Sequence, residues 1–379
     1  MKNDIVITGM FRSGTTLLST MLNAHPDICS SSDSFQPILK EFRNEIARSL
    51  SYEIDPNTPF ADYYFDSKKI SLMKKIGESD LHMSSERVDL KSLRQAIAKY
   101  ASGYSPKIIP LSHQISGGTF SELFESGLKL VKEAYGDNKT SHICTKLVWT
   151  DEFIPVFLKT YPGMKILNIV RDPRAVCASR NAYSYKYPWL FLIRQWRKLA
   201  TMSWLYCIRG YSFRDRALFI HYEELVKEPE KNARKICDFL RLDYHPKMVD
   251  AGNFIGGSGE PWQQNSTYYK DEKGLRAFNH ESIDKWKMVL TKKEIEFIEH
   301  LCFYEMKLFG YQPLYATGEK FPTEFIFHPS MVLKEELAEW IRKYAMSEEE
   351  TIRELALESV RFSSIGKGGE GDRVRDEDK

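Results

Sequence analysis

The sequence predicts an α/β fold of three layers, in which a central, mostly parallel sheet lies between helices. The first observation is a β-branched run at residues 4–8 that leads into a glycine-bounded loop and then a helical pattern. The second is the return of this strand–loop–helix order at residues 165–180 and 217–239. Strands that alternate with helices form parallel sheets covered on both faces. We therefore expect an α/β fold with a helical insertion and a C-terminal helical extension.

Local patterns predict the first strand and helix and the elements that follow them. Residues 4–8 are apolar and β-branched, as buried strands are, and residues 15–23 carry leucine and methionine at helical spacing. Further along the chain, the pattern predicts a helix at 151–160, a strand at 165–170, a helix from 175 to 180 with Pro173 near its first turn, a strand at 217–221 and a helix through 223–239.

The remaining segments predict the insertion, the loops and the domain boundaries. The pattern of residues 38–142 predicts a charged helical insertion. Residues 251–280 are rich in Gly, Asn, Ser and Tyr, which predicts a long functional loop. We expect one domain over residues 1–315, with helices resuming at 281–310. A helical extension over 316–362 and a disordered, glycine- and charge-rich tail over 363–379 are expected to follow.

Composition narrows the class of protein. A formal net charge of +2 and 28% charged residues disfavour nucleic acid or membrane as the main partner, so an anion site must be local. No stretch has the length and apolarity of a membrane span or a signal peptide, and we expect a cytoplasmic protein; a homodimer is left open. The six cysteines are widely spaced, which predicts buried free thiols and neither a disulfide framework nor a metal site.

The loop after the first strand predicts a phosphate site. Its sequence, Gly9-Met-Phe-Arg-Ser-Gly-Thr-Thr16, has four residues between its glycines, as in a Walker P-loop. In such a loop, backbone N–H groups and a helix N-terminus converge on an anion, and hydroxyl groups add donors. The fold is therefore P-loop-like. The Walker lysine position, however, is Thr15, and the cation is Arg12 inside the loop, which argues against phosphoryl transfer.

Two segments together resemble the nucleotide site of sulfotransferases that use 3′-phosphoadenosine 5′-phosphosulfate (PAPS). Phe11-Arg-Ser-Gly-Thr-Thr-Leu-Leu18 is similar to their 5′-phosphosulfate loop, closest to the tyrosylprotein and bacterial branch, which has arginine there. The segment that starts at Ile169-Val-Arg171 is similar to their 3′-phosphate segment. For this nucleotide the resemblance implies binding by Arg12, Ser13, Gly14, Thr15, Thr16, Leu17, Arg171, Ser179, Tyr222, Lys285 and Trp286.

The predicted positions of Arg171 and Ser179 also favour a phosphate site. Arg171 leaves the end of a predicted strand, and Ser179 is expected two turns into the next helix, where both could reach one phosphate dianion. A surface Arg–Asp pair that caps a helix is the plainer interpretation of this segment alone. For Tyr222 and Trp286, packing in the core is a similar alternative.

The resemblance further implies four catalytic residues. Arg12 would stabilise the sulfuryl oxygens, Lys146 would contact the leaving oxygen, and Ser266 would lie near the sulfuryl group. Asp33 matches the position of a catalytic glutamate and would be the base, although a turn or an N-cap role also suits its serine-rich setting. A solvated surface position is the alternative for Lys146.

Two histidines are rival bases, because cytosolic members of the family use histidine. His113 lies in the insertion, where nothing decides its role, whereas His25 precedes a proline at a helix end and is expected to be structural. The function expected is transfer of a sulfuryl group from PAPS, without a metal, to a hydroxyl of a small or medium-sized metabolite. The alternatives are a small-molecule or nucleoside kinase with a degenerate P-loop, and a non-catalytic binding protein of the same fold.

Overall fold

The computed structural model describes residues 4–52, 70–179, 189–208, 213, 215–262, 269–271 and 274–317. Five strands form one parallel sheet in the order β2-β3-β1-β4-β5, and a two-stranded antiparallel hairpin, β6-β7, is separate from it. The strands are β1 (Ile5–Gly9), β2 (Ile28–Ser32), β3 (His142–Lys146), β4 (Lys165–Val170), β5 (Ala217–His221), β6 (Tyr269–Asp271) and β7 (Gly274–Arg276).

Helices join the strands and make the fold α/β, as predicted. The longer ones are α1 (Thr15–Asn23), α2 (Gln36–Ser49), α3 (Ile70–Glu78), α4 (Leu90–Tyr104), α5 (Phe120–Tyr135), α9 (Trp189–Ser203), α11 (Pro229–Leu240) and α14 (Lys292–Leu308). Shorter ones are α6 (Ile154–Thr160), α7 (Pro173–Cys177), α10 (Tyr222–Lys227), α12 (Glu281–Asp284) and α13 (Trp286–Val289). Irregular helical turns are η1 (Pro106–Gln114), η2 (Asp151–Phe153), η3 (Trp204–Ile208), η5 (Pro246–Val249) and η6 (Ala251–Asn253).

The chain divides into two compact units, one made of residues 1–171 with 198–285 and the other of residues 172–197 with 286–379. The first unit holds the sheet. The second holds α7, α13 and α14, where buried Arg174 pairs with Asp172 and Glu299 at 2.6 Å each. The predicted domain over 1–315 stays a prediction, and all but the first two residues of the predicted extension and tail lie outside the described residues.

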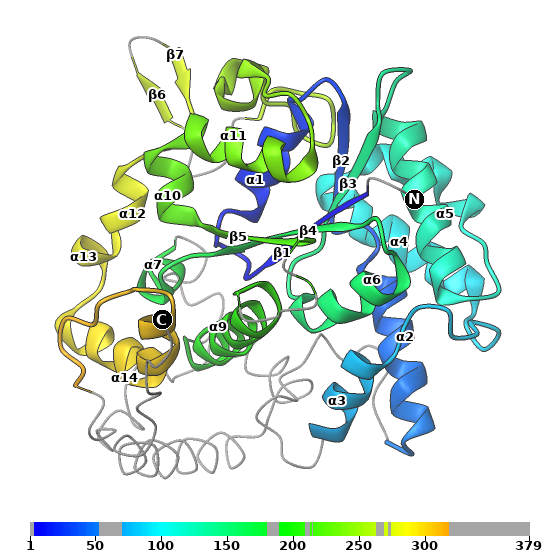
Figure 1. Ribbon diagram of the computed structural model, residues 1–379, viewed down its shortest axis with the longest axis horizontal. Coiled ribbons are helices and arrows are strands. Elements are labelled where there is room, and N and C mark those ends of the chain that lie inside the picture. The colour runs from blue at the N-terminus through cyan, green and yellow to red at the C-terminus, as the bar shows by residue number, and fades with distance from the viewer. Residues whose placement is uncertain are drawn as a thin grey trace, which may run out of the picture. The chain divides into compact units, whose positions relative to one another are not determined.

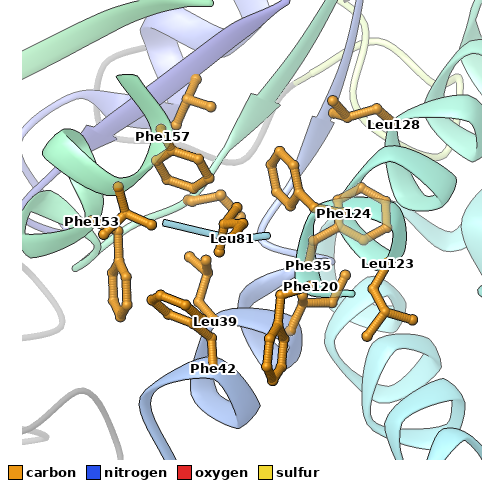
Figure 2. Packing of buried hydrophobic residues seen from close by; sticks show 14 of the residues in the cluster. Phe35, Leu39, Phe42, Leu81, Phe120, Leu123, Phe124, Leu128, Phe153 and Phe157 are labelled. Atoms are coloured by element: carbon orange, nitrogen blue, oxygen red, sulfur yellow. The ribbon is translucent and has the colours of Figure 1, made fainter. Parts of the chain in front are cut away.

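Alternating side chains bury both faces of the sheet. On β1, Ile5 and Ile7 join a cluster with α1, α10 and α11, which lie together on one side of the strands in Figure 1. Val6 points into the other cluster, with α2, α4, α5 and α6. Figure 2 shows the aromatic centre of this second cluster, in which the Phe42 and Phe120 rings meet edge to face at 5.4 Å. Burial on both faces explains the near-continuous apolar runs of the strands.

Two local expectations were wrong, and β2 and β3 were not predicted as strands. The helix expected over 223–239 is two helices, because Pro229 begins α11 and has no N–H with which to continue α10. The helix after Arg171 ends at Cys177, so Ser179 lies beyond it and not two turns inside. β2 was not predicted, since its sequence Ile-Cys-Ser-Ser-Ser has little strand propensity; pairing with β3 and cover from α1 hold it.

The cysteines are buried free thiols, as predicted. Burial raises the pKa of Cys144 to about 12 and that of Cys29 to about 11. These thiols are therefore protonated near neutral pH and poor nucleophiles. Among the helices in the described ranges, none combines the length and apolarity needed to cross a bilayer.

Candidate active site at the carboxyl edge of the sheet

The sheet gathers the predicted residues by its topology. Because its strands are all parallel, their carboxyl ends meet at one edge. A predicted functional residue or loop lies at the end of each strand. β1 leads into the phosphate loop, and β3 ends at Lys146. Asp33, Arg171 and Tyr222 follow β2, β4 and β5, respectively. Ligands of open α/β sheets bind at this edge. The sequence correctly predicted that the phosphate loop, Arg171 and Tyr222 follow β1, β4 and β5.

The loop between β1 and α1 has the form of an anion cradle. Gly14 caps α1 in a left-handed conformation at φ 94°, and no acidic residue occupies the first turn of α1. Ser13 is fully buried, and its Oγ has no hydrogen-bond partner within the described part of the chain. A buried hydroxyl without a partner and an uncompensated helix N-terminus both favour an anionic ligand.

Close packing explains both glycines of the loop. At Gly9, a Cβ atom would lie 2.3 Å from the carbonyl oxygen of Ile169 on β4. At Gly14, it would lie 2.4 Å from the ring of Tyr222, which is buried and follows β5. Any larger residue would push the loop off the strands beside it.

The residues of the phosphate loop differ in their burial and contacts. Thr15 is buried, and Thr16 is half-buried with its hydroxyl toward Lys146. Leu17 packs its side chain in the core under α1, so it could serve an anion only through its backbone N–H. Arg12 sits in the left-handed region at φ 68°.

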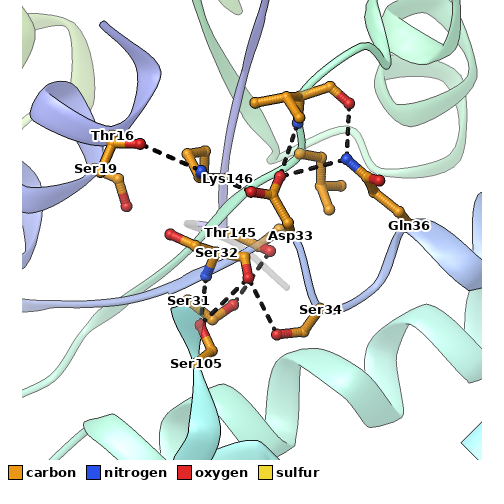
Figure 3. A network of polar contacts seen from close by, with 12 residues as sticks. Thr16, Ser19, Ser31, Ser32, Asp33, Ser34, Gln36, Ser105, Thr145 and Lys146 are labelled. Carbon is orange, nitrogen blue, oxygen red and sulfur yellow. Dashed lines mark hydrogen bonds and ion pairs between the residues drawn. The ribbon is translucent and has the colours of Figure 1, made fainter. Parts of the chain in front are cut away.

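Lys146 and Asp33 form a buried ion pair, drawn in Figure 3, with Nζ 2.6 Å from Oδ2. Lys146 Nζ is also 3.5 Å from Thr16 Oγ1 in the phosphate loop and 5.1 Å from the centre of the Tyr104 ring. The solvated-surface alternative for Lys146 is therefore excluded by its 3% exposure. The pair places a cation and a carboxylate directly beside the anion cradle.

Neighbouring groups fix the direction of the Asp33 carboxylate. Oδ1 accepts hydrogen bonds from the Val148 backbone N–H at 3.1 Å and from Gln36 Nε2 at 3.3 Å. The Gln36 amide also donates to the Val148 carbonyl, and the Asp33 N–H donates to the Lys146 carbonyl at 2.6 Å. Asp33 does not cap a helix, because α2 begins only at Gln36 and has no side-chain cap. Oδ1 therefore accepts hydrogen bonds from Val148 and Gln36, whereas Oδ2 pairs with Lys146.

Sequence reasoning missed Gln36, Trp149 and Tyr104. Trp149 has φ 62°, its ring meets that of Phe11 edge to face at 5.1 Å, and its Nε1 donates to Met10 Sδ at 3.2 Å. It therefore braces the phosphate loop. No sequence signal marks these residues, apart from the position of Trp149 three residues after Lys146.

Arg171 joins the loop to the segment that precedes Lys285. Its guanidinium donates to the carbonyl of Arg12 at 3.0 Å and to that of Ser282 at 2.5 Å, and stacks on the Tyr222 ring at 4.2 Å. The Tyr222 hydroxyl is 2.7 Å from Ser282 Oγ. The structure therefore brings Arg12 and Arg171 together. The plainer interpretation was right about the cap, because Asp172 accepts from the Arg174 N–H at the start of α7, and wrong about the surface, because Arg171 and Asp172 are buried.

The other predicted residues are placed separately. Lys285 is exposed between α12 and α13. In the second unit, Trp286 is buried under the Arg174 guanidinium at 4.0 Å, and Ser179 Oγ has no hydrogen-bond partner among the described residues. Ser266 lies outside the described residues.

Neither histidine contacts the ion pair. His25 is structural, as expected: its Nδ1 accepts from the Asp27 N–H, and its Nε2 is 2.9 Å from the Asp243 carbonyl and donates to it. His113 is exposed on η1, and its Nδ1 is 2.8 Å from the Pro110 carbonyl.

A second polar cluster lies under the loop. Asp151 accepts from Thr8 at 2.7 Å, from Asn168 at 2.5 Å and from Ser203 at 3.1 Å. Burial raises the pKa of Asp151 to about 6. This cluster ties the end of β1 to β4 and to the turn that follows Lys146.

Comparisons with known proteins point to one family. The profile described as "Sulfotransferase family" matches residues 4–246. Carbohydrate sulfotransferase 3 of Tetronarce californica is 27% identical over 173 residues, 40% of this chain and 36% of that protein. Protein-tyrosine sulfotransferase 1 of Danio rerio is 21% identical over 289 residues, 74% of this chain and 65% of that protein. The chain thus spans less than two thirds of either relative.

Among solved structures, the sulfotransferase domain from the Synechococcus PCC 7002 olefin synthase aligns with a TM-score of 0.47 at 16% identity, over 82% of this chain and 95% of that chain. The family match covers well over half of the 379 residues. The resemblance seen in the two nucleotide motifs is confirmed, and the chain belongs to the sulfotransferase family of PAPS-dependent enzymes.

Proposed function

We propose that this chain transfers a sulfuryl group from PAPS to a hydroxyl of a small or medium-sized metabolite. The observation that carries the proposal is the buried Lys146–Asp33 pair, 2.6 Å apart, beside a phosphate loop that lacks the Walker lysine. A cation and a base next to an anion cradle are what in-line transfer from a phosphosulfate to a hydroxyl requires.

PAPS would supply the sulfuryl group and two anionic ends. The residues present suit both: the phosphate loop with Ser13 at one end, and Arg171, a planar donor of paired hydrogen bonds, at the other. Arg12 and Lys146 would hold the charge that develops on the sulfuryl and leaving oxygens. Asp33, fixed through Oδ1, would take the proton of the acceptor hydroxyl on Oδ2.

The acceptor proposal is supported in two ways. Carbohydrate and tyrosine, in the names of the relatives, both carry hydroxyl groups. A small cleft, with no charged side chain among its lining residues, is lined in part by Thr16 and Tyr104, which both contact Lys146.

Turnover with radiolabelled PAPS tests the function. With a panel of phenols, alcohols and glycosides, we expect label in an acceptor and release of adenosine 3′,5′-bisphosphate, and none with ATP labelled at its outer phosphate. Label transfer from ATP would support the kinase alternative, and nucleotide binding without transfer to any acceptor would support a binding protein.

A further inference from the structure

Among the described residues, three groups form an ion pair, a hydrogen bond or a cation–π contact with the ammonium of Lys146. Asp33 Oδ2 lies 2.6 Å from Nζ, Thr16 Oγ1 lies 3.5 Å from it, and the centre of the Tyr104 ring lies 5.1 Å from it. Asp33 and Thr16 belong to the predicted site, whereas Tyr104 is the last residue of α4, in the predicted helical insertion. A residue from outside both nucleotide motifs thus contacts the lysine of the ion pair.

Tyr104 differs from the other two neighbours in its exposure. Asp33 is buried and Thr16 is half-buried, whereas Tyr104 is 49% exposed. Lys146 itself is only 3% exposed, so a nearly buried ammonium lies against a ring that water reaches. The face of an aromatic ring attracts a cation, and the attraction grows when the cation is desolvated. The ring therefore stabilises the charge of Lys146 while Asp33 and Thr16 keep their own contacts with it.

The backbone of Tyr104 is held against the end of β2. The hydroxyl of the next residue, Ser105, accepts from the Ser32 N–H at 2.8 Å and donates to the Ser32 carbonyl at 3.3 Å, and Figure 3 shows the two residues side by side. Ser32 directly precedes Asp33. The loop after η6 also packs on this backbone, because a Cβ atom at Gly257 would lie 1.7 Å from the Tyr104 carbonyl oxygen. Although its side chain is half exposed, Tyr104 is thus fixed in position beside the strand that leads to Asp33.

We propose that Tyr104 is a positioning residue for the transfer reaction, whose ring holds the Lys146 ammonium at Asp33 and Thr16 and keeps bulk water from it. A lysine carries its charge on a flexible four-carbon stem, so its position depends on its neighbours. Water around the ammonium would weaken its attraction to the charge that develops on a leaving oxygen. Tyr104 acts through Lys146. This inference rests on the proposed function and adds to it a residue of the helical insertion.

Competitive acetylation of the full chain, without nucleotide, tests the contact independently of turnover. In the wild type, we expect Lys146 to react with acetic anhydride much more slowly than the half-buried Lys40. Tyr104→Ala should raise the acetylation rate of Lys146 about tenfold, because it removes the ring that covers the ammonium. Tyr104→Phe keeps the ring face and should leave the rate at the wild-type value. Mass spectrometry of the lysine-containing peptides measures both rates in one sample.

The same helix offers a matched control, Tyr100→Ala. Tyr100 lies one turn before Tyr104 in α4, and the centre of its ring is 5.4 Å from Lys40 Nζ. The control therefore removes an equivalent ring from a lysine that is not part of the ion pair. It should raise the acetylation rate of Lys40 and leave that of Lys146 unchanged, the reverse of the result expected for Tyr104→Ala.

Turnover with PAPS and a phenol of the same panel measures the consequence for the reaction. We expect kcat of Tyr104→Ala to fall roughly threefold to thirtyfold, the range of one cation–π contact. Tyr104→Phe and Tyr100→Ala should keep kcat within about twofold of the wild type. The affinity for adenosine 3′,5′-bisphosphate, measured by calorimetry, should change less than about threefold in all variants, because the phosphate loop and Arg171 are intact.

The outcomes separate this inference from the proposed function. Unchanged acetylation of Lys146 in Tyr104→Ala would overturn the inference whatever the activity, and so would faster acetylation with a wild-type kcat. If Lys146 becomes reactive but the wild type sulfates no acceptor, the contact is real and the proposed function fails, together with the positioning role that rests on it. Urea denaturation checks that the variants are folded, and Tyr104→Leu, which fills much of the same space without a ring face, replaces Tyr104→Ala if the smaller side chain destabilises the chain.

Discussion

At the scale of single residues, the site is built from unfavourable backbone conformations. Arg12, Asp33 and Trp149 are non-glycine residues with φ between 58° and 68°. A left-handed conformation costs such a residue about 1 kcal/mol or more and persists where surrounding contacts impose it. Here the hydrogen bonds to Asp33 and the packing of Trp149 on Phe11 impose it. The charged groups are thus held in position before any ligand binds.

Replacing Asp33 with asparagine tests its role as base. The amide oxygen can still accept from Val148, whereas the proton acceptor is lost. We expect kcat to fall roughly 10²- to 10⁴-fold, with the affinity for adenosine 3′,5′-bisphosphate within about twofold of wild type. Steady-state kinetics and calorimetry measure both. Asp243→Asn, at an exposed position, is the control, and a D33N enzyme with wild-type kcat would exclude Asp33 as the base.

Replacing Arg171 tests the second anion site. In Arg171→Ala, the preference for adenosine 3′,5′-bisphosphate over adenosine 5′-phosphate should fall roughly tenfold to a hundredfold, as one charged hydrogen-bonding group is lost. Arg171→Lys keeps the charge but loses the planar pair of donors. Its preference for the bisphosphate should therefore lie between those of the wild type and Arg171→Ala. Both affinities come from calorimetry. An equal loss for the two nucleotides would mean that Arg171 only supports the loop through the Arg12 carbonyl.

At the scale of elements, the phosphate loop was predictable and its supports were not. A β-branched strand, paired glycines and a leucine-rich helix are local signals, so residues 4–23 could be assigned directly. β2 carries three serines and became a strand through its neighbours, and Gln36 reaches Val148 across 112 positions. Such contacts arise from tertiary packing, which no local pattern encodes.

Two glycine substitutions measure how tightly the loop is packed. Gly14→Ala would force a Cβ atom against Tyr222 at positive φ, and we expect the free energy of unfolding to fall by roughly 2 kcal/mol or more. Gly103→Ala is the matched control, because this glycine lies in α4 with open space around its Cβ position. It should raise stability by about 0.5–1 kcal/mol. Urea denaturation measures both, and equal effects would contradict the packing described.

At the scale of the whole molecule, the parallel order of the strands turns separate motifs into one site. Asp33 and Lys146 are 113 positions apart and meet because β2 and β3 are adjacent, with Ser32 opposite Lys146. Their proposed roles, like that of Ser266, come from family resemblance, whereas the ion pair arises from strand order and could not be derived from spacing.

Buried Asp151 makes stability depend on pH. Its pKa is about 6 in the folded chain against an ordinary 3.8, so the folded state holds the proton more tightly than the unfolded state. Stability is therefore highest below about pH 4 with respect to this group and declines as pH rises through 6, by about 3 kcal/mol at most. Asp151→Asn should remove this part of the decline between about pH 4 and pH 7, as urea denaturation will show. Parallel pH profiles for the two proteins would contradict it.

One nucleotide with two separated anionic ends is proposed to bind across the carboxyl edge of the sheet. Calorimetric titration of the full chain with adenosine 3′,5′-bisphosphate, adenosine 5′-phosphate and ATP is the decisive measurement. We predict that the bisphosphate binds at least about a hundredfold more tightly than either of the others. Equal affinities for the three nucleotides, or tighter binding of ATP, would contradict it.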